Sequence, residues 1–268
     1  MKALLMALFT LAATAFAQTP VVASGGVLNA ASFATSQGVA PGSLVSIFGT
    51  NLAASLAEAD SIPLSTSLGN VAVTFNNIAA PLLFVSHAAS GDQINAQLPF
   101  AVPAGSAQVV VNNNGSVSAP MSFNVISAAP GIFAVNYGVG QAIAYGGTDG
   151  QIAAAPGSVP GLTTHPAKIG DPQTLEILAT GLGAVNPPVT TGSAVTDGQI
   201  HYTVVNPTVL VGGVQAQLVF SGMQPQFPGV YQINIILAAG TPTGDSVPLQ
   251  LVMNGITTTA QVTIAVTN

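Results

Sequence analysis

The stretch QINAQL, residues 93–98, alternates polar and apolar side chains, and its first three residues return as QIN at 232–234. A period of two turns one set of side chains to a buried face and the other to solvent, as in a β-strand. The same alternation occurs at 71–76, 122–125, 231–237 and 262–267. Beyond residue 17 no segment keeps a helical period, so the sequence predicts an all-β protein with at most one short helical turn, around 53–59.

The stretches around the two QIN copies also repeat, in the same order along the chain. PAG at 103–105 corresponds to PTG at 242–244, NNIAA at 76–80 to GGVQA at 212–216, and IFGTNL at 47–52 to LATGLG at 178–183. Each copy runs from a Gly-rich turn through a hairpin and a long central strand to two closing strands. About seven short strands per ~100 residues is typical of an immunoglobulin-like fold. We predict two tandem immunoglobulin-like β-sandwiches.

The first 17 residues have the features of a cleaved signal peptide. A positive start at Met1 and Lys2 precedes an apolar run, and AFA at 15–17 is the small-x-small pattern that signal peptidase recognises. The alternative is a membrane anchor, but the run is shorter than the ~20 apolar residues that cross a bilayer. We expect a signal peptide at 1–17, a first sandwich at 18–127, a connecting segment at 128–165 and a second sandwich at 166–268.

The connecting segment is rich in Gly and Pro. Some ~40 residues without structure are unusual in a compact protein, so we expect part of it, such as 141–145, to add a strand or to pack between the sandwiches. Its TDGQI at 148–152 recurs verbatim at 196–200. Asp-Gly favours tight turns, whereas a calcium loop needs several closely spaced oxygen ligands. We therefore predict turns at both places.

Charge is scarce in this chain. Asp, Glu, Lys and Arg make up 4% of the residues, against ~25% in an average globular domain, and beyond residue 17 Lys168 is the only Lys or Arg. Phosphate backbones and anionic lipid surfaces both require several basic side chains, so the sequence excludes nucleic acid and anionic membranes as partners. There are no cysteines, so stability must come from a packed core, and the polar but uncharged surface suits a secreted or cell-envelope protein.

Several motifs resemble a known family. VLNAASF at 27–33 and VAPGSLVSIFGTNL at 39–52 are similar to the Solibacter-type C-terminal domain of exported acidobacterial proteins, and QINAQLPF at 93–100, APGIF at 129–133 and ATGLGAV at 179–185 follow in order. The opening of residues 41–52 is also similar to IPT/TIG immunoglobulin-like domains. The resemblance implies two IPT/TIG-like sandwiches on the cell exterior and no assigned reaction. The family's unit usually follows other domains, whereas here it stands directly behind the predicted signal peptide.

No cluster of residues in the sequence predicts catalysis. His87 and Asp92 are near each other, but a metal site or a hydrolase needs more groups than this pair, and we prefer a loop histidine on a sandwich edge. Glu58 and Asp60 are neighbouring carboxylates, yet charges in a polar loop are usually solvated. There is no Gly-x-Ser-x-Gly elbow and no dinucleotide fingerprint. We predict that the chain is no enzyme, with no cofactor and no catalytic or metal-binding residues.

Tyr137 and Tyr145 are the candidate ligand contacts. Sugars stack on flat aromatic rings, and these two tyrosines lie in the connecting segment, where a shallow groove between the sandwiches could hold a glycan. The alternative, which we favour, is that they join the sandwiches. Few charges also leave strand edges open to pairing. The sequence thus predicts a non-catalytic extracellular structural or interaction module of the adhesion type, with an unknown protein or glycan partner and self-association through strand edges. A carbohydrate-binding module is the alternative.

Overall fold

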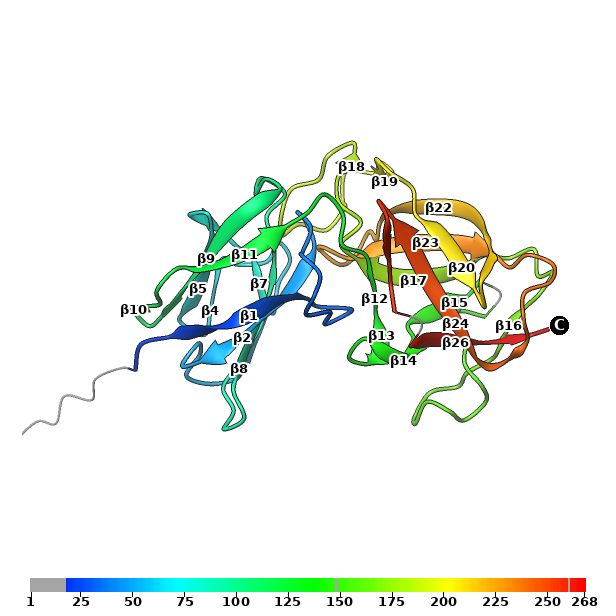
Figure 1. The fold of residues 1–268 in the computed structure, drawn as a ribbon, viewed down its shortest axis with the longest axis horizontal. Coiled ribbons are helices and arrows are strands. Elements are labelled where there is room, and N and C mark those ends of the chain that lie inside the picture. Colours follow the sequence, from blue (N-terminus) through cyan, green and yellow to red (C-terminus); the bar gives the residue numbers. More distant parts are fainter. Residues whose placement is uncertain (1–17, 148, 260) are drawn as a thin grey trace, which may run out of the picture.

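The computed structural model describes residues 18–147, 149–259 and 261–268. Every helix or strand assigned in these ranges is a β-strand, and the strands form four sheets that pair into two sandwiches, side by side along the long axis (Figure 1). The predicted fold class is confirmed. The expected signal peptide, 1–17, lies outside the described residues. Within the described ranges, no helix has the length and hydropathy that crossing a membrane requires.

The first sandwich consists of a five-stranded and a six-stranded sheet. The strands of the five-stranded sheet are β1 (Val21–Asn29), β2 (Leu44–Thr50), β3 (Ala57–Glu58), β7 (Leu82–Ser86) and β8 (Asp92–Gln97). Those of the six-stranded sheet are β4 (Ser67–Leu68), β5 (Val71–Phe75), β6 (Ile78–Ala79), β9 (Gly105–Asn113), β10 (Ser116–Val117) and β11 (Met121–Val125). Their orders are β1-β2-β8-β7-β3 and β10-β9-β5-β4, with β11 also paired to β9 and β6 to β5.

The alternating pattern of β8 predicts the burial of its side chains correctly except at Gln97, which belongs to the polar set but is buried at the junction between the sandwiches. Ile94 and Ala96 are fully buried in the first core, whereas Gln93 and Asn95 are partly exposed on the outer face of the sheet. Phe75 of β5 closes this core from the opposite sheet and is also fully buried. The period of two therefore decides which face of the central strand meets the core.

The short helical turn expected around 53–59 is wrong. Ala57 and Glu58 are extended and pair with Val85 and Phe84 at the edge of the sheet. Without them β7 would expose a row of backbone donors and acceptors on that side, and this short strand satisfies part of the row. Local helix-forming residues are here outweighed by pairing with a distant strand.

The second sandwich consists of a seven-stranded and an eight-stranded sheet. The seven-stranded sheet contains β12 (Gly131–Ile132), β15 (Ala144–Gly146), β17 (Leu175–Thr180), β18 (Val185–Asn186), β19 (Tyr202–Thr203), β22 (Gln217–Met223) and β23 (Tyr231–Ile236). The eight-stranded sheet contains β13 (Ala134–Asn136), β14 (Val139–Ala142), β16 (Ala167–Lys168), β20 (Thr208–Val211), β21 (Val214–Gln215), β24 (Gly244–Met253), β25 (Ile256–Thr257) and β26 (Val262–Thr267).

The repeated sequence motifs occupy equivalent places in the two sandwiches. The order β2-β8-β7 in the first matches β17-β23-β22 in the second, and β11-β9-β5 matches β26-β24-β20. The two QIN copies therefore lie on the central strands β8 and β23. Equivalent placement of motifs so far apart in the chain supports an internal duplication.

The segment 128–165 contributes strands to the sheets of the second sandwich. β12 and β15 pair with β17, on the side where β1 pairs with β2 in the first sandwich. β14 pairs in parallel with β26. The strand expected around 141–145 is present as β14 and β15. In the second sandwich β12 and β15 take the edge position that β1 has in the first.

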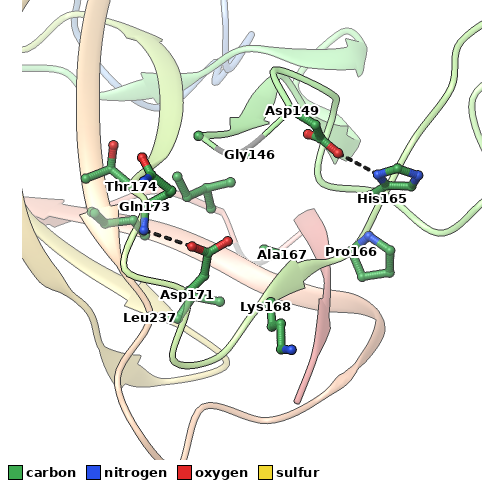
Figure 2. A pocket seen from close by; sticks show the side chains of 13 residues that line it. Gly146, Asp149, His165, Pro166, Ala167, Lys168, Asp171, Gln173, Thr174 and Leu237 are labelled. Carbon is green, nitrogen blue, oxygen red and sulfur yellow. Dashed lines mark hydrogen bonds and ion pairs between the residues drawn. The ribbon is translucent and has the colours of Figure 1, made fainter.

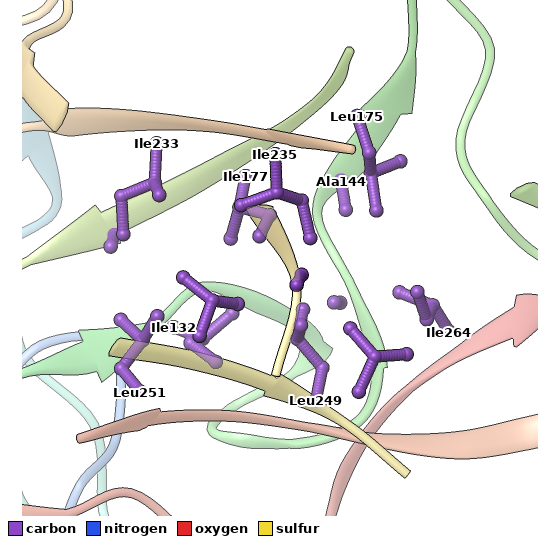
Figure 3. Packing of buried hydrophobic residues seen from close by; sticks show 14 of the residues in the cluster. Ile132, Ala144, Leu175, Ile177, Ile233, Ile235, Leu249, Leu251 and Ile264 are labelled. Carbon is purple, nitrogen blue, oxygen red and sulfur yellow. The ribbon is translucent and has the colours of Figure 1, made fainter. Parts of the chain in front are cut away.

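The second core contains isoleucine, leucine and alanine side chains from both sheets and from the segment 128–165, as Figure 3 shows for Ile132, Ala144 and their neighbours. Tyr231 is the largest side chain in it and is fully buried, as its strand pattern predicts. Its hydroxyl donates a hydrogen bond to Gly183 O. Burial raises the pKa of the Tyr231 hydroxyl well above its ordinary value, so it stays protonated and can keep donating.

Three buried polar side chains join the two sandwiches. Asn29 Nδ2 donates to Ala129 O at 2.7 Å, and the Thr180 hydroxyl accepts the Leu44 amide at 2.9 Å. Gln97 Oε1 accepts the Gly192 amide at 2.6 Å. These side chains are 2%, 0% and 1% exposed, respectively. Buried polar groups with hydrogen-bond partners across the junction favour one fixed arrangement of the two sandwiches.

Candidate functional site

Tyr137 lies on the turn between β13 and β14 and is 80% exposed. Its backbone has a φ of 42°, and the next residue, Gly138, packs so closely on the first sandwich that an added Cβ would lie 2.6 Å from Ser32 O. This close approach brings the Tyr137 ring against Phe33 of the first sandwich, edge to face, with 5.8 Å between the ring centroids. The ring contacts both halves of the molecule and still offers most of its surface to solvent.

Tyr145 has different surroundings. It lies in β15, opposite Glu176 of β17, and is half-buried. Its ring packs on a small apolar cluster of Ile152, Ala154 and Val159. Burial raises the pKa of the neighbouring Glu176 carboxyl. The structure thus places Tyr137 on a turn and Tyr145 in a strand, with different ring neighbours, and of the two only Tyr137 reaches across to the first sandwich.

A groove of about 690 Å³ runs between the sandwiches beside the Tyr137 turn. Its volume lies within the range of about 300–1,000 Å³ typical of small-ligand sites. Gly138 and Val139, directly after Tyr137, form part of its wall. The rest is rich in hydroxyl and amide side chains, among them Ser32, Ser36, Gln37, Asn124, Thr257 and Gln261. Such a lining suits a neutral, hydroxyl-bearing ligand.

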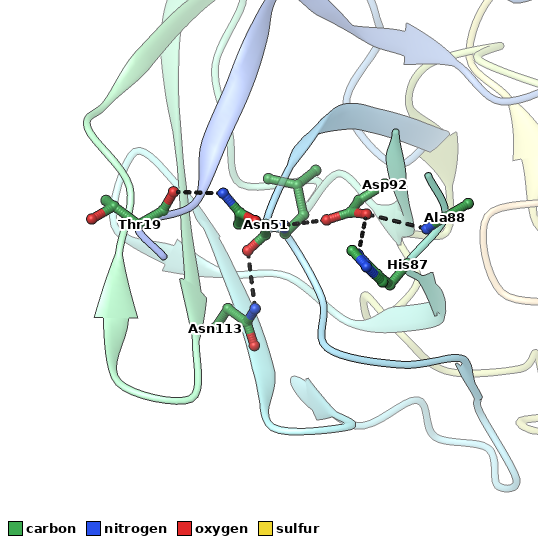
Figure 4. Close-up of polar contacts among 7 residues, drawn as sticks. Thr19, Asn51, His87, Ala88, Asp92 and Asn113 are labelled. Atoms are coloured by element: carbon green, nitrogen blue, oxygen red, sulfur yellow. Dashed lines mark hydrogen bonds and ion pairs between the residues drawn. The ribbon is translucent and has the colours of Figure 1, made fainter. Parts of the chain in front are cut away.

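His87 and Asp92 do come together, but in a structural arrangement (Figure 4). His87 Nδ1 lies 2.7 Å from Asp92 Oδ1, and the Leu52 amide donates to Asp92 Oδ2 at 2.7 Å. The Ala88 amide adds a weaker bond at 3.3 Å. The carboxylate is 2% exposed and the imidazole 53%. Asp92 therefore holds two loops in place, and its oxygens are already occupied by protein donors.

A second histidine–aspartate pair lines a small cavity of about 70 Å³ (Figure 2). His165 Nδ1 lies 2.5 Å from Asp149 Oδ2. The Gln151 amide donates to Asp149 Oδ1, and this bond, followed by the contact with His165, lowers the pKa of the Asp149 carboxyl. The cavity is far smaller than the range typical of ligand sites. The Asp149-Gly150 turn predicted from the sequence is present, with Gly150 at a φ of 67°.

The second TDGQI copy builds a third such pair. His201 is buried, with Nδ1 donating to Pro187 O at 2.6 Å and Nε2 3.1 Å from Asp197 Oδ1. The bond to Pro187 O, and then the contact with Asp197, raise the pKa of His201. The Gln199 amide, and then His201, lower the pKa of Asp197. The arrangement favours an imidazolium whose two N–H groups both donate, which fixes a loop.

The three pairs are separate from one another. Within the described ranges, no group of three or more His, Asp and Glu side chains is placed to hold a metal ion. Glu58 lies in the edge strand β3 and Asp60 in the exposed loop that follows it. Each of the three histidines thus has a local structural partner.

Phe33 is a contact at the candidate site that the sequence does not predict, because it lies more than a hundred residues before its partner Tyr137. Its ring also neighbours that of Phe48, at 6.4 Å between centroids. Residues 44–48, LVSIF, do not alternate in polarity, so the outward direction of Phe48 follows from the structure. Ile47 beside it is fully buried, and alternation turns the next side chain of β2 to the outer face.

Comparisons with known proteins support the fold. A model of the IPT/TIG domain family matches residues 31–125, which lie in the first sandwich and make up less than half of the chain. No curated protein matches the sequence.

Two solved structures are similar at low identity. SGBP-B of the Bacteroides ovatus mixed-linkage glucan utilization locus, in complex with a mixed-linkage heptasaccharide, is 14% identical with a TM-score of 0.33, and the alignment covers 93% of this chain and 47% of that chain. The S-layer protein SbsC, domains 5–6, is 11% identical with a TM-score of 0.25, covering 93% and 99%. The chain spans about half the length of SGBP-B, and neither likeness says anything about ligands. The immunoglobulin-like resemblance is thus confirmed for residues 31–125, which are similar to the IPT/TIG domain.

Proposed function

We propose that this chain is a non-catalytic extracellular interaction module of the adhesion type, exported by a signal peptide at 1–17. The observation that carries the proposal is the junction of Asn29, Gln97 and Thr180, which joins the two sandwiches through buried hydrogen bonds. Two sandwiches held in one arrangement present their surfaces to a partner at a reduced ordering cost. The structural roles of the three histidine–aspartate pairs support the absence of catalysis. The resemblance to the Solibacter-type family stays a prediction.

Self-association through a strand edge belongs to this proposal. β22 has a neighbour on its outer side only near Tyr202, which pairs with Gly222, within the part of the chain that the structure describes. Val219 of β22 is 50% exposed, and Val204, just after β19, is 63% exposed. Edge strands are usually protected by charges, especially Lys. The residues of β22 carry no charge. A second copy is therefore the partner that we propose for this edge.

Light scattering over a range of protein concentrations tests this proposal. We expect the protein of residues 18–268 to gain mass with concentration, and Val219→Lys to abolish the gain because a buried, unpaired ammonium is costly. Leu162→Lys adds the same charge at a side chain of similar exposure, 53%, away from the edge, and should leave association unchanged. A strictly monomeric protein at high concentration contradicts the proposed self-association.

Carbohydrate binding is the second candidate function, favoured by the exposed Tyr137 ring beside a groove lined with hydroxyls and amides. A glycan array tests it. We expect binding to at least one glycan and a clear loss of signal in Tyr137→Ala, since its ring is open to solvent. Tyr145→Ala is the comparison for the other candidate and should have the smaller effect, because that ring is half-buried on its own cluster. No signal on the array, or a signal unchanged by both substitutions together, removes this candidate.

A further inference from the structure

A hollow of about 480 Å³ lies on the outer face of the first sandwich, where β2, β7 and β8 meet the loop before β8. Its volume is suitable for a small ligand. The lining combines one aromatic ring with hydroxyl and amide groups, provided by Phe48, Thr50, Ser86, Ser90 and Gln93. The hollow is separate from the groove between the sandwiches, whose walls are other residues.

A row of aromatic rings leads away from this hollow. Phe48 lines it, Phe33 lies 6.4 Å from Phe48, and Tyr137 lies 5.8 Å from Phe33, measured between ring centroids. Phe48 and Phe33 are partly exposed, and Tyr137 is 80% exposed. The row therefore continues from the first sandwich onto the turn of the second. An extended ligand could follow it, with apolar faces against successive rings.

An ordered pair of amides stands beside the first ring. Phe48 is opposite Gln93 in the strand register. Gln93 Nε2 donates to Asn95 Oδ1 at 2.8 Å, and the Ser46 hydroxyl donates to the same oxygen at 2.9 Å. These bonds leave the Gln93 carbonyl and the Asn95 NH₂ without a partner among the described residues. A fixed acceptor and a fixed donor next to an aromatic face match a sugar ring, whose hydroxyls both donate and accept.

The charge of the hollow favours a neutral ligand. Asp92 is part of its lining, but its carboxylate already accepts bonds from Leu52, Ala88 and His87. Lys168, the only Lys or Arg beyond residue 17, lies in β16 of the second sandwich. An acidic sugar would find no such cation here and would face a carboxylate.

We propose that the hollow at Phe48 and Gln93, together with the ring row from Phe48 through Phe33 to Tyr137, binds a neutral oligosaccharide. The proposal rests on the carbohydrate-binding candidate function and moves its centre from the groove to the outer face of the first sandwich. Phe48 provides the stacking surface. Gln93, together with Asn95, which lies next to it on the same face but outside the lining of the hollow, provides the directional hydrogen bonds. Tyr137 extends the site.

The second sandwich contains a natural control for this site. Gln232 Nε2 donates to Asn234 Oδ1 at 3.0 Å, as in the first copy. Leu178 stands opposite Gln232, where Phe48 stands opposite Gln93. The second copy thus keeps the amide pair but has an aliphatic side chain in place of the ring. Substituting Phe48 by Leu converts the first copy to the state of the second while keeping an apolar side chain.

Isothermal titration of residues 18–268 with cellohexaose, xylohexaose, mannohexaose and maltohexaose, and with hexagalacturonate as an acidic probe, tests the proposal. We expect at least one neutral hexasaccharide to bind more tightly than the acidic one. Phe48→Leu should raise its Kd about tenfold or more, as truncating a central aromatic anchor does. Leu178→Ala, the matched change in the second sandwich, should leave the Kd unchanged. A thermal melt of each variant shows that it is folded.

The outcomes separate this site from the broader function. If none of the four neutral probes binds, the proposed site is overturned. A positive glycan array would then still support carbohydrate binding, but not at this hollow. If Phe48→Leu leaves binding intact but Tyr137→Ala weakens it, the protein binds carbohydrate in the groove between the sandwiches and not in the hollow. Tighter binding of hexagalacturonate overturns the neutral specificity. Binding that falls with Phe48→Leu and with Gln93→Ala supports the site as proposed.

Discussion

Asp92→Ala is expected to lower the free energy of unfolding by about 3 kcal/mol. The Asp92 carboxylate is 2% exposed and accepts the backbone amides of Leu52 and Ala88 as well as the His87 ring. Truncation leaves the Leu52 amide, whose residue is fully buried, without its acceptor. Losing hydrogen bonds to a charged group and stranding a buried donor both destabilise the fold. Urea unfolding followed by circular dichroism measures the change.

His87→Ala is the control for this prediction. The imidazole is 53% exposed, so its contact with Asp92 contributes little, within about 1 kcal/mol. If His87→Ala destabilised the protein as much as Asp92→Ala, the stabilising effect of the Asp92 carboxylate would come mainly from its contact with His87 and not from its bonds to the backbone of the two loops. A hydrolytic activity that disappears in His87→Ala while stability is kept would contradict the non-catalytic function.

The strands with clear alternation could be predicted from the sequence, and those without it could not. β8 shows its period over six residues, and its inward and outward side chains follow directly from it. β12 has two residues, Gly131 and Ile132, which is too short to show any period. Its place in the sheet depends on β17, far along the chain. Pairing partners that distant are chosen by tertiary packing, which a local pattern does not contain.

The candidate site was predictable only in part for the same reason. Tyr137 and Tyr145 are close in sequence, which suggests a shared surface. In the structure β14 lies between them, and the Tyr137 ring contacts Phe33 whereas the Tyr145 ring packs on its own apolar cluster. The contacts of Phe33 with Phe48 and Tyr137 depend on how the two sandwiches meet. The outward direction of Gln93 and Asn95 was readable from alternation. Their bonding to each other, with one donor and one acceptor left over, depends on side-chain rotamers that the sequence does not specify.

The double variant Asn29→Ala/Gln97→Ala is expected to uncouple the two sandwiches. Asn29 Oδ1 also accepts the Ala31 and Ser32 amides, so its loss removes the junction bond and leaves two nearby donors unsatisfied. Gln97 Nε2 donates to Gly42 O at 3.0 Å while its carbonyl holds Gly192. We expect each substitution to cost about 2–3 kcal/mol, and the double variant to unfold in two urea transitions instead of one.

Small-angle X-ray scattering of the folded double variant should show a wider range of interdomain arrangements, because two buried side-chain links are lost. The bonds of the Leu44 amide to Thr180, of the Leu64 amide to Gly192 O and of the Phe100 amide to Thr191 Oγ1 remain. Gln108→Ala is the matched control: Gln108 is an exposed amide side chain of β9 in the first sandwich, outside the junction contacts. It should keep one transition and an unchanged scattering curve. A double variant that unfolds in a single transition at the original midpoint would show that apolar packing and the remaining hydrogen bonds are enough to join the sandwiches. The arrangement of the two sandwiches would then not depend on the side chains of Asn29 and Gln97. The outer-face site that spans Phe48 and Tyr137 would be unchanged in the double variant.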